Sequence, residues 1–151
     1  MKKYMSSNKR KVILDTNIYI DIIKSGELEI FYQQRYLIYL PAIVLMELKA
    51  GAHSKEAIDT INDLRDYFKR KNRIIEPTRD DFDLAGEILA KLQSEKGYDL
   101  KKTYSLANDV LIALTARKIG AEVATQNKTD FEAIKEIKDF RLEITSTYIM
   151  A

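Results

Sequence analysis

The sequence has no cysteine and no tryptophan, and it has one histidine, two prolines and five glycines among its 151 residues. The lack of cysteine excludes disulfides, thiolate nucleophiles and cysteine-based zinc sites, and the single His53 cannot form the histidine cluster that zinc or copper usually requires. The longest stretch without charge, residues 36–46, is far shorter than the roughly 20 residues of a membrane-spanning helix. Any bound metal ion is therefore expected to have oxygen ligands, and we expect no association with a membrane.

An excess of charge of one sign is also missing, since 25 Lys+Arg and 23 Asp+Glu give a net charge of +2. A value this small does not indicate a nucleic-acid-binding protein. Local basic clusters occur at residues 9–11, 69–73 and 101–102, and a solvated surface is the simpler interpretation of each. The basic N-terminus is not followed by the apolar segment of a signal peptide, which favours a cytoplasmic protein.

The length predicts one domain with one hydrophobic core. With 46% apolar and 32% charged residues the composition is that of a folded globular chain. No internal repeat, low-complexity tract or linker-like segment divides the sequence. We therefore expect a basic tail over residues 1–10 and a single domain over residues 11–151.

Short apolar runs alternate with segments of helical periodicity along the chain. Strands are expected at residues 11–14, 36–40, 74–75, 122–125 and 142–144. Helices are expected at residues 18–24, 42–50, 54–71, 82–92 and 106–119, with capping boxes at residues 78–81 and at residues 129–132, the second opening a further short helix. On the fourth helix the expected buried stripe is Phe82, Ala85, Ile88, Leu89 and Leu92. This alternation predicts a parallel sheet with helices on both faces, in which polar functional groups gather beyond the carboxyl ends of the strands.

Two carboxylates in the first third of the chain occupy unusual places. Asp15 directly follows the first strand, where its simplest role is to cap the next helix. Glu47 falls between Ile43 and Val44 when residues 42–50 are projected at about 100° per residue, so it lies within an apolar face. A carboxylate there must be paired, protonated or bound to a metal, and an ion pair with Lys or Arg is as good an explanation as a metal site.

Two further carboxylates follow in the second half. Asp109 lies near the start of a helix that is apolar almost all round, in line with Ala113 and Ala116, whose small side chains would let the helix approach the sheet closely. Asp130 lies inside the second capping box, after the strand that ends at Thr125. Each of the two is also explained by the helix dipole, which favours an acid in a first turn.

Taken together, the four acids are expected at one edge of one sheet. Four neighbouring carboxylates repel one another and raise their pKa values unless a cation neutralises them. Hard divalent ions such as Mg²⁺ or Mn²⁺ suit oxygen ligands, and a site of this kind serves phosphoryl chemistry by activating water and offsetting charge on the leaving oxygen.

Four stretches, in this order, resemble the PIN-domain ribonucleases, and most closely the VapC-like toxins of bacterial and archaeal toxin–antitoxin pairs. They are residues 12–18 (VILDTNI), 43–51 (IVLMELKAG), 108–116 (NDVLIALTA) and 125–131 (TQNKTDF). The resemblance implies a three-layer α/β/α sandwich around a parallel sheet and an endoribonuclease that uses one or two Mg²⁺ or Mn²⁺ ions. It implies that the catalytic, metal-binding acids are Asp15, Glu47, Asp109 and Asp130, supported by Thr16, Asn17, Thr125 and Asn127. It also implies an RNA substrate, a homodimer and a cognate antitoxin that holds the toxin inactive.

Two other functions have to be weighed against this hypothesis. Phosphatases that use an aspartate nucleophile also begin with an apolar strand ending in Asp, but they need a second Asp two residues later, where this chain has Asn17. A non-catalytic RNA-binding or protein-interaction module with the same fold is the remaining alternative.

Overall fold

The computed structural model describes residues 9–33, 35–103 and 105–145. Within this part, five parallel strands form one sheet in the order β3-β2-β1-β4-β5. They are β1 (Lys11–Leu14), β2 (Leu37–Pro41), β3 (Ile74–Ile75), β4 (Glu122–Thr125) and β5 (Arg141–Ile144). The strand predictions are confirmed, with small shifts in the boundaries of β2 and β5.

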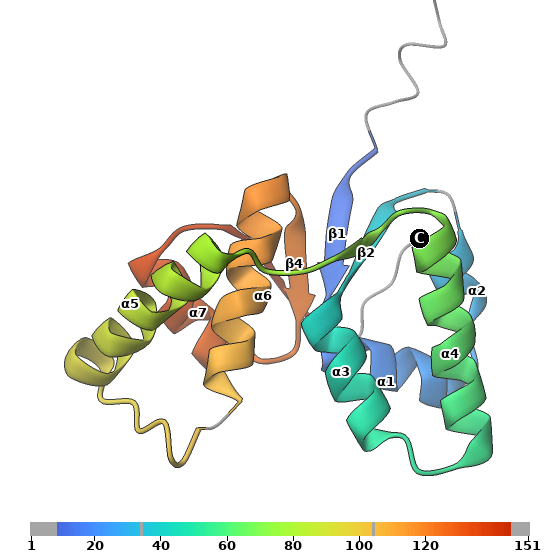
Figure 1. The fold of residues 1–151 in the computed structure, drawn as a ribbon, viewed down its shortest axis with the longest axis horizontal. Helices are drawn as coiled ribbons and strands as arrows, with labels where there is room; N and C mark the ends of the chain where they lie inside the picture. The colour runs from blue at the N-terminus through green and yellow to red at the C-terminus, as the bar shows by residue number, and fades with distance from the viewer. Residues whose placement is uncertain (1–8, 34, 104, 146–151) are drawn as a thin grey trace, which may run out of the picture.

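Helices cover both faces of the sheet, which confirms the predicted three-layer arrangement. Figure 1 shows α1 (Thr16–Ser25), α2 (Glu29–Tyr32), α3 (Ala42–Gly51) and α4 (Lys55–Arg70) on one side of the strands. On the other side lie α5 (Arg79–Lys96), α6 (Leu106–Ile119) and α7 (Lys128–Ile137). In the described part of the chain, no helix combines the length and the apolar character needed to cross a bilayer.

The strand order reverses direction between β1 and β4. From β1 the chain moves outward to β2 and β3, whereas from β4 it moves the other way to β5. Because such crossovers are right-handed, the helices after β1 and after β4 pack on opposite faces. Their starts diverge at the carboxyl ends of β1 and β4, which is the position where open α/β sheets form a ligand crevice.

The core is built on the central strand and the helix across it. Val12, Ile13 and Leu14 of β1 have no exposed surface, as expected for a strand covered on both faces. On α6, apolar residues are buried all round the helix, and Ala113 and Ala116 are among them. The small side chains let α6 lie close to β1 and β4, so the start of α6 is brought to the crevice.

The stripe predicted for α5 is only partly right. Ala85, Ile88 and Leu92 are buried, but Leu89 is half-buried and Phe82 is 57% exposed. At 100° per residue, Phe82 lies roughly 85° from the centre of the buried stripe, so it faces solvent beside the contact rather than within it. The capping box that opens α5 is present: Thr78 Oγ1 accepts a hydrogen bond from Asp81 N, and Asp81 Oδ2 accepts one from Thr78 N.

The predicted start of the last helix is wrong. The residue that caps α7 is Asn127, not Thr129, because Asn127 Oδ1 accepts a hydrogen bond from Asp130 N at 3.3 Å. The turn tightens earlier than expected, since Thr125 Oγ1 accepts a hydrogen bond from Asn127 N at 3.0 Å. Asp130 is therefore the third residue of α7 rather than its first.

The short helix α2 has no counterpart among the predicted elements. It is one turn long, which is too short to show a helical period in the sequence. Its position comes from a tertiary contact, because the buried ring of Phe31 stacks on Tyr19 of α1 with 4.9 Å between ring centroids.

Candidate active site

Asp15 lies at the carboxyl end of β1 and caps α1. Its Oδ1 accepts a hydrogen bond from Thr16 N at 2.8 Å, which is the capping role expected from its position. Its Oδ2 faces the neighbouring strand and accepts hydrogen bonds from Thr125 Oγ1 at 2.7 Å and from Asn17 Nδ2 at 3.3 Å. Capping therefore accounts for one oxygen of Asp15, and the second is directed to the end of β4.

Glu47 projects from α3 into the same crevice. Its Oε1 accepts a hydrogen bond from Thr16 Oγ1 at 2.6 Å, and its Oε2 accepts one from Asn108 Nδ2 at 3.2 Å. Among the described residues, no Lys or Arg forms an ion pair with this carboxylate, so the ion-pair explanation of its position is not supported. Glu47 instead joins α3 to α1 and α6 through neutral donors.

Asp109 is the acid of the four whose carboxylate receives the weakest hydrogen bonding. It lies in the first turn of α6 and is 6% exposed, and the hydrogen bond that reaches its Oδ2 from Asn127 Nδ2 is long, at 3.4 Å. Burial raises the pKa of Asp109 to about 8, with further contributions from the negative charges of Asp15, Glu47 and Asp130. The hydrogen bonds show that the four acids lie near one another. Asn127 Nδ2 reaches both Asp109 and Asp130. Glu47 binds Thr16, next to Asp15, and Asn108, next to Asp109.

Asp130 is held from two sides. Its Oδ2 accepts a hydrogen bond from Asn127 Nδ2 at 3.0 Å, and its Oδ1 accepts one from Tyr98 Oη at 2.8 Å. Burial raises the pKa of Tyr98 to about 12, together with its hydrogen bond to Asp130 and the charges of Asp130 and Asp109.

Burial also raises the pKa of Asp15. The hydrogen bonds from Thr125, Thr16 and Asn17 act in the opposite direction, and the charge of Glu47 raises the pKa further. The net increase favours the protonated form of Asp15 in this buried position.

All eight residues expected at the site lie at this edge of the sheet. Thr125 is fully buried at the end of β4, and Asn17 also accepts a hydrogen bond from Gln126 N at 3.3 Å, which ties α1 to the turn after β4. The expected site residues that the structure brings together are Asp15, Thr16, Asn17, Glu47, Asp109, Thr125, Asn127 and Asp130.

Two hydrogen-bonding residues of the site were not expected. Asn108 directly precedes Asp109 in the chain, and this position was a sequence signal that Asn108 could reach the crevice. Tyr98 follows Gly97 in a loop and has no motif around it. Only the packing of α5 against α7 shows that its hydroxyl reaches Asp130.

The chemistry of this donor set suits a hard divalent cation. The acids offer oxygen ligands only, and no Lys or Arg in the described part of the chain forms an ion pair with any of the four. Over residues 9–33, 35–103 and 105–145, no group of three or more Asp, Glu, His or Cys side chains is already arranged as a metal site. Asp15, Glu47, Asp109 and Asp130 are the residues that could close around an ion.

The largest basic cluster lies far from these acids. Residues 69–73 end α4 and immediately precede β3, so they lie at the amino ends of the parallel strands, opposite the crevice. Arg73 is not solvated as expected, because it is 9% exposed and its guanidinium lies over the rings of Tyr67 and Phe68. Residues 1–8 of the expected basic tail lie outside the described residues, and Arg10 pairs with Glu122 at 2.8 Å.

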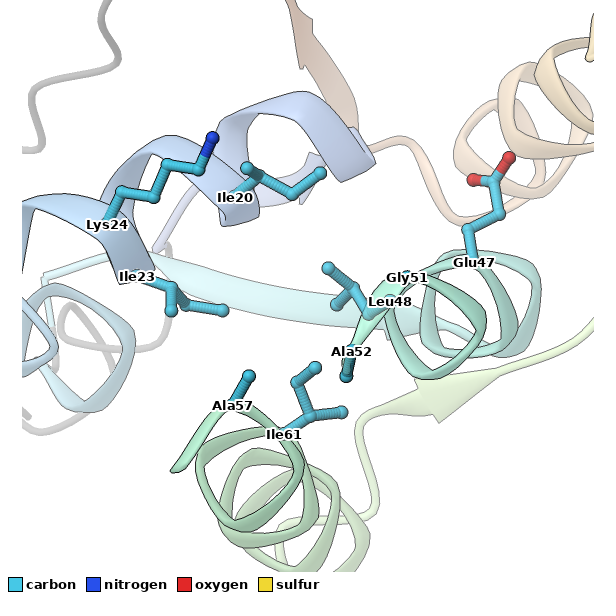
Figure 2. A pocket seen from close by; sticks show the side chains of 9 residues that line it. All are labelled: Ile20, Ile23, Lys24, Glu47, Leu48, Gly51, Ala52, Ala57 and Ile61. Atoms are coloured by element: carbon cyan, nitrogen blue, oxygen red, sulfur yellow. The ribbon is translucent and has the colours of Figure 1, made fainter. Parts of the chain in front are cut away.

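A pocket of about 330 Å³ adjoins the acidic crevice. Figure 2 shows apolar side chains of α1, α3 and α4 around it, including Ile20, Leu48 and Ile61, while Glu47 projects from α3 away from them. Ile20 is 40% exposed. The crevice is therefore continued by an apolar surface.

Comparison with known proteins adds family evidence to this geometry. The family model described as "PIN domain" matches residues 12–137. No curated protein is significantly similar to the chain in sequence.

Solved structures of VapBC proteins contain similar chains. One is VapBC2 from Rickettsia felis bound to a DNA fragment from their promoter, at 27% identity and a TM-score of 0.62, covering 90% of this chain and 99% of that chain. Another is DNA-bound VapBC from Salmonella typhimurium, at 26% identity and a TM-score of 0.64, covering 89% of this chain and 98% of that chain. VapBC-1 from nontypeable Haemophilus influenzae, at 22% identity and a TM-score of 0.57, shares the fold over 89% of this chain and 97% of that chain.

Proposed function

Since this chain belongs to the PIN domain family, we propose that it is a Mg²⁺- or Mn²⁺-dependent endoribonuclease that hydrolyses RNA phosphodiester bonds. The observation that carries the proposal is that four acids meet at one edge of the sheet, where no Lys or Arg of the described residues forms an ion pair with them. Burial and the three neighbouring carboxylates raise the pKa of Asp109 to about 8, in agreement with this geometry. A protein gains nothing in stability from such a cluster, so a role in binding a cation explains why the acids are together.

A bound divalent cation supplies positive charge at the phosphate and lowers the pKa of a water molecule. Without that charge the four acids would repel the negative RNA backbone. Asp15, Glu47, Asp109 and Asp130 are proposed to hold one or two such ions. Asp109 receives the weakest hydrogen bonding of the four, so its carboxylate has the most to gain from a cation.

The neutral residues of the site keep the other acids in place. Thr125 and Asn17 donate hydrogen bonds to Asp15 Oδ2, and Thr16 donates one to Glu47 Oε1. Asn127 spans Asp109 and Asp130. Because these side chains are oriented beforehand, less conformational freedom has to be lost when a cation and a phosphate bind.

Cleavage of RNA by the purified protein tests the proposal. We expect cleavage with Mg²⁺ or Mn²⁺, loss of cleavage with EDTA, and loss of cleavage in Asp15→Asn and Asp109→Asn. Asp83→Asn, which changes an exposed acid of α5, is the matched control and should cut as the wild type does. Equal cleavage by Asp109→Asn and wild type, with EDTA harmless, would contradict the proposal. RNA left intact, with no Mn²⁺ binding in calorimetry, would favour the non-catalytic binding module.

The biological role proposed for the enzyme is that of the toxin in a toxin–antitoxin pair. The support is similarity, at 26–27% identity, to chains of VapBC complexes. The apolar pocket beside Glu47 offers a surface on which a segment of an antitoxin could lie. Induced expression should arrest growth, and co-expression of a small DNA-binding protein encoded next to it should restore growth.

Mapping RNA 5′ ends after brief induction of wild type and Asp109→Asn would identify the target. The resemblance to VapC-like toxins also leads us to propose a homodimer, which light scattering tests.

A further inference from the structure

The side chain of Tyr98 reaches the acidic crevice from outside the segments that carry the expected site residues. It lies in the loop between α5 and α6, and its hydroxyl donates a hydrogen bond to Asp130 Oδ1 at 2.8 Å across 32 positions of sequence. Asn127, which binds the other oxygen of Asp130, comes from the same turn as Asp130 itself. Tyr98 is thus the non-local support of this acid.

The backbone fixes where the Tyr98 side chain points. Gly97 ends α5 in the left-handed conformation, with φ of 72°, and Tyr98 N donates a hydrogen bond back to Leu92 O at 3.2 Å. This closure is typical of a helix that ends on a glycine and turns sharply. An ion pair between Lys96 and Glu136 holds the end of α5 against α7. The hydroxyl of Tyr98 is therefore directed to Asp130 by a fixed helix end and not by a free loop.

Among the described residues, no side chain other than Tyr98 donates a hydrogen bond to Asp130 from a distant part of the sequence. Its two oxygens are occupied by different donors, so rotation of the carboxylate about its bond to Cβ would break one of the two hydrogen bonds. Loss of the Tyr98 donor would leave the local bond from Asn127, which also reaches toward Asp109. The orientation of Asp130 relative to Asp109 then depends on a single donor shared between two acids.

We infer that Tyr98 is a positioning residue of the metal site, which holds Asp130 in the orientation needed to bind a divalent cation. The inference rests on the proposed function and extends it by a residue from the α5–α6 loop. Groups that hydrogen-bond to metal ligands commonly matter about 10-fold to 100-fold in metal affinity, because they fix the orientation of the ligand.

The test compares Mn²⁺ binding by wild type and Tyr98→Phe in isothermal titration calorimetry. The substitution removes the hydroxyl and keeps the ring, so the melting temperature of the metal-free protein should stay within about 2 °C. We expect the dissociation constant for Mn²⁺ to rise about 10-fold. RNA cleavage should recover at saturating Mn²⁺, because the acid itself is intact. Tyr32→Phe, which removes a hydroxyl from α2 on the other face of the sheet, should leave the dissociation constant unchanged.

A double-mutant cycle separates positioning from a general structural role. In an Asp130→Ala background, adding Tyr98→Phe should change Mn²⁺ affinity by less than about 2-fold, because the group that Tyr98 positions is gone. An unchanged or tighter Mn²⁺ dissociation constant for Tyr98→Phe would overturn the inference, and so would an effect that persists in the Asp130→Ala background. If wild type neither binds Mn²⁺ nor cuts RNA, the proposed function fails and the inference fails with it. If wild type does both and Tyr98→Phe is identical to it, only the inference fails.

Discussion

Replacing Asp109 with asparagine is expected to stabilise the metal-free protein while abolishing RNA cleavage. In the folded state the carboxyl of Asp109 is buried beside three other acids, which raises its pKa to about 8 from the ordinary 3.8. An acid whose pKa is higher in the folded state than in the unfolded state binds its proton more tightly when the protein is folded. Its contribution to stability is complete below the unfolded pKa and is lost as the pH rises to the folded pKa. Stability of the wild type is therefore lost as the pH rises from about 4 to about 8, and changes little from this group above that.

The size of the effect follows from the distance between the two pKa values. At pH 7, the pH lies roughly 3 units above the unfolded pKa, and each unit corresponds to about 1.4 kcal/mol, which gives about 4 kcal/mol. Asparagine removes the charge but leaves a buried amide with few partners, which costs about 1–2 kcal/mol. The net gain of about 2–3 kcal/mol corresponds to a rise in melting temperature of about 4–12 °C for a chain of this length.

The assay is thermal unfolding, followed by circular dichroism in EDTA at several pH values. The difference between Asp109→Asn and wild type should grow from pH 4 to pH 8, and Asp83→Asn should follow the wild type. Adding Mg²⁺ should raise the melting temperature of the wild type but not that of Asp109→Asn, because the ion binds to the folded cluster. A melting temperature of Asp109→Asn equal to or below that of wild type at pH 8 without metal would refute the reasoning.

Three further outcomes are expected. Thr125→Val removes the 2.7 Å hydrogen bond to buried Asp15 and should lower the free energy of unfolding by about 1–3 kcal/mol in chemical denaturation. Thr115→Val, which removes a hydrogen bond within its own helix, should lower it by less than about 1 kcal/mol. Equal losses would argue against a special role for Thr125. EDTA should stop RNA cleavage and excess Mg²⁺ or Mn²⁺ should restore it, so cleavage that persists in EDTA would rule out the metal requirement. Thr78→Ala removes the cap of α5 and should cost about 0.5–2 kcal/mol without altering cleavage at 25 °C. The control is Thr60→Ala, at a half-buried position of α4, which should cost no more than about 0.5 kcal/mol. A large loss of cleavage in Thr78→Ala would show that the capped end is coupled to the site.

The elements with strong local patterns were predicted well. The apolar run of β1 and the helix at 106–119 appear in the structure with the expected bounds, because their burial on all sides leaves a clear apolar signature in the sequence. Predictions at the edge of a pattern were weaker. Phe82 follows the period of α5 loosely and faces solvent. The local pattern predicts the start of α7 at Thr129, because the turn formed by Thr125 and Asn127 leaves no local signature in the sequence.

The acids of the candidate site could be found from sequence because their positions depend on topology. Parallel strands place their carboxyl ends at one edge, so acids that follow β1 and β4 must come close once the strands are neighbours. The explanation of Glu47 could not be decided in the same way. A buried carboxylate at position 47 is expected whether it forms an ion pair or binds a metal ion, so the sequence does not separate the two. Only the tertiary contacts show that the two oxygens of Glu47 accept hydrogen bonds from neutral donors, Thr16 and Asn108.

By itself, the sequence determined the class of fold, the absence of cysteine chemistry and carboxylates as the only plausible ligands for a metal ion. These properties depend on composition and on local periodicity, which need no knowledge of distant contacts. The tertiary structure decided how each acid is held, that Asp109 is the least compensated of them, and that Tyr98 supports Asp130. Those properties depend on residues far apart in the sequence, such as Tyr98 and Asp130, which are 32 positions apart, and Thr125 and Asp15, which are 110 positions apart. Hydrogen bonds require side chains to meet within about 3 Å, and only the packing of the helices on the two faces of the sheet brings these side chains so close.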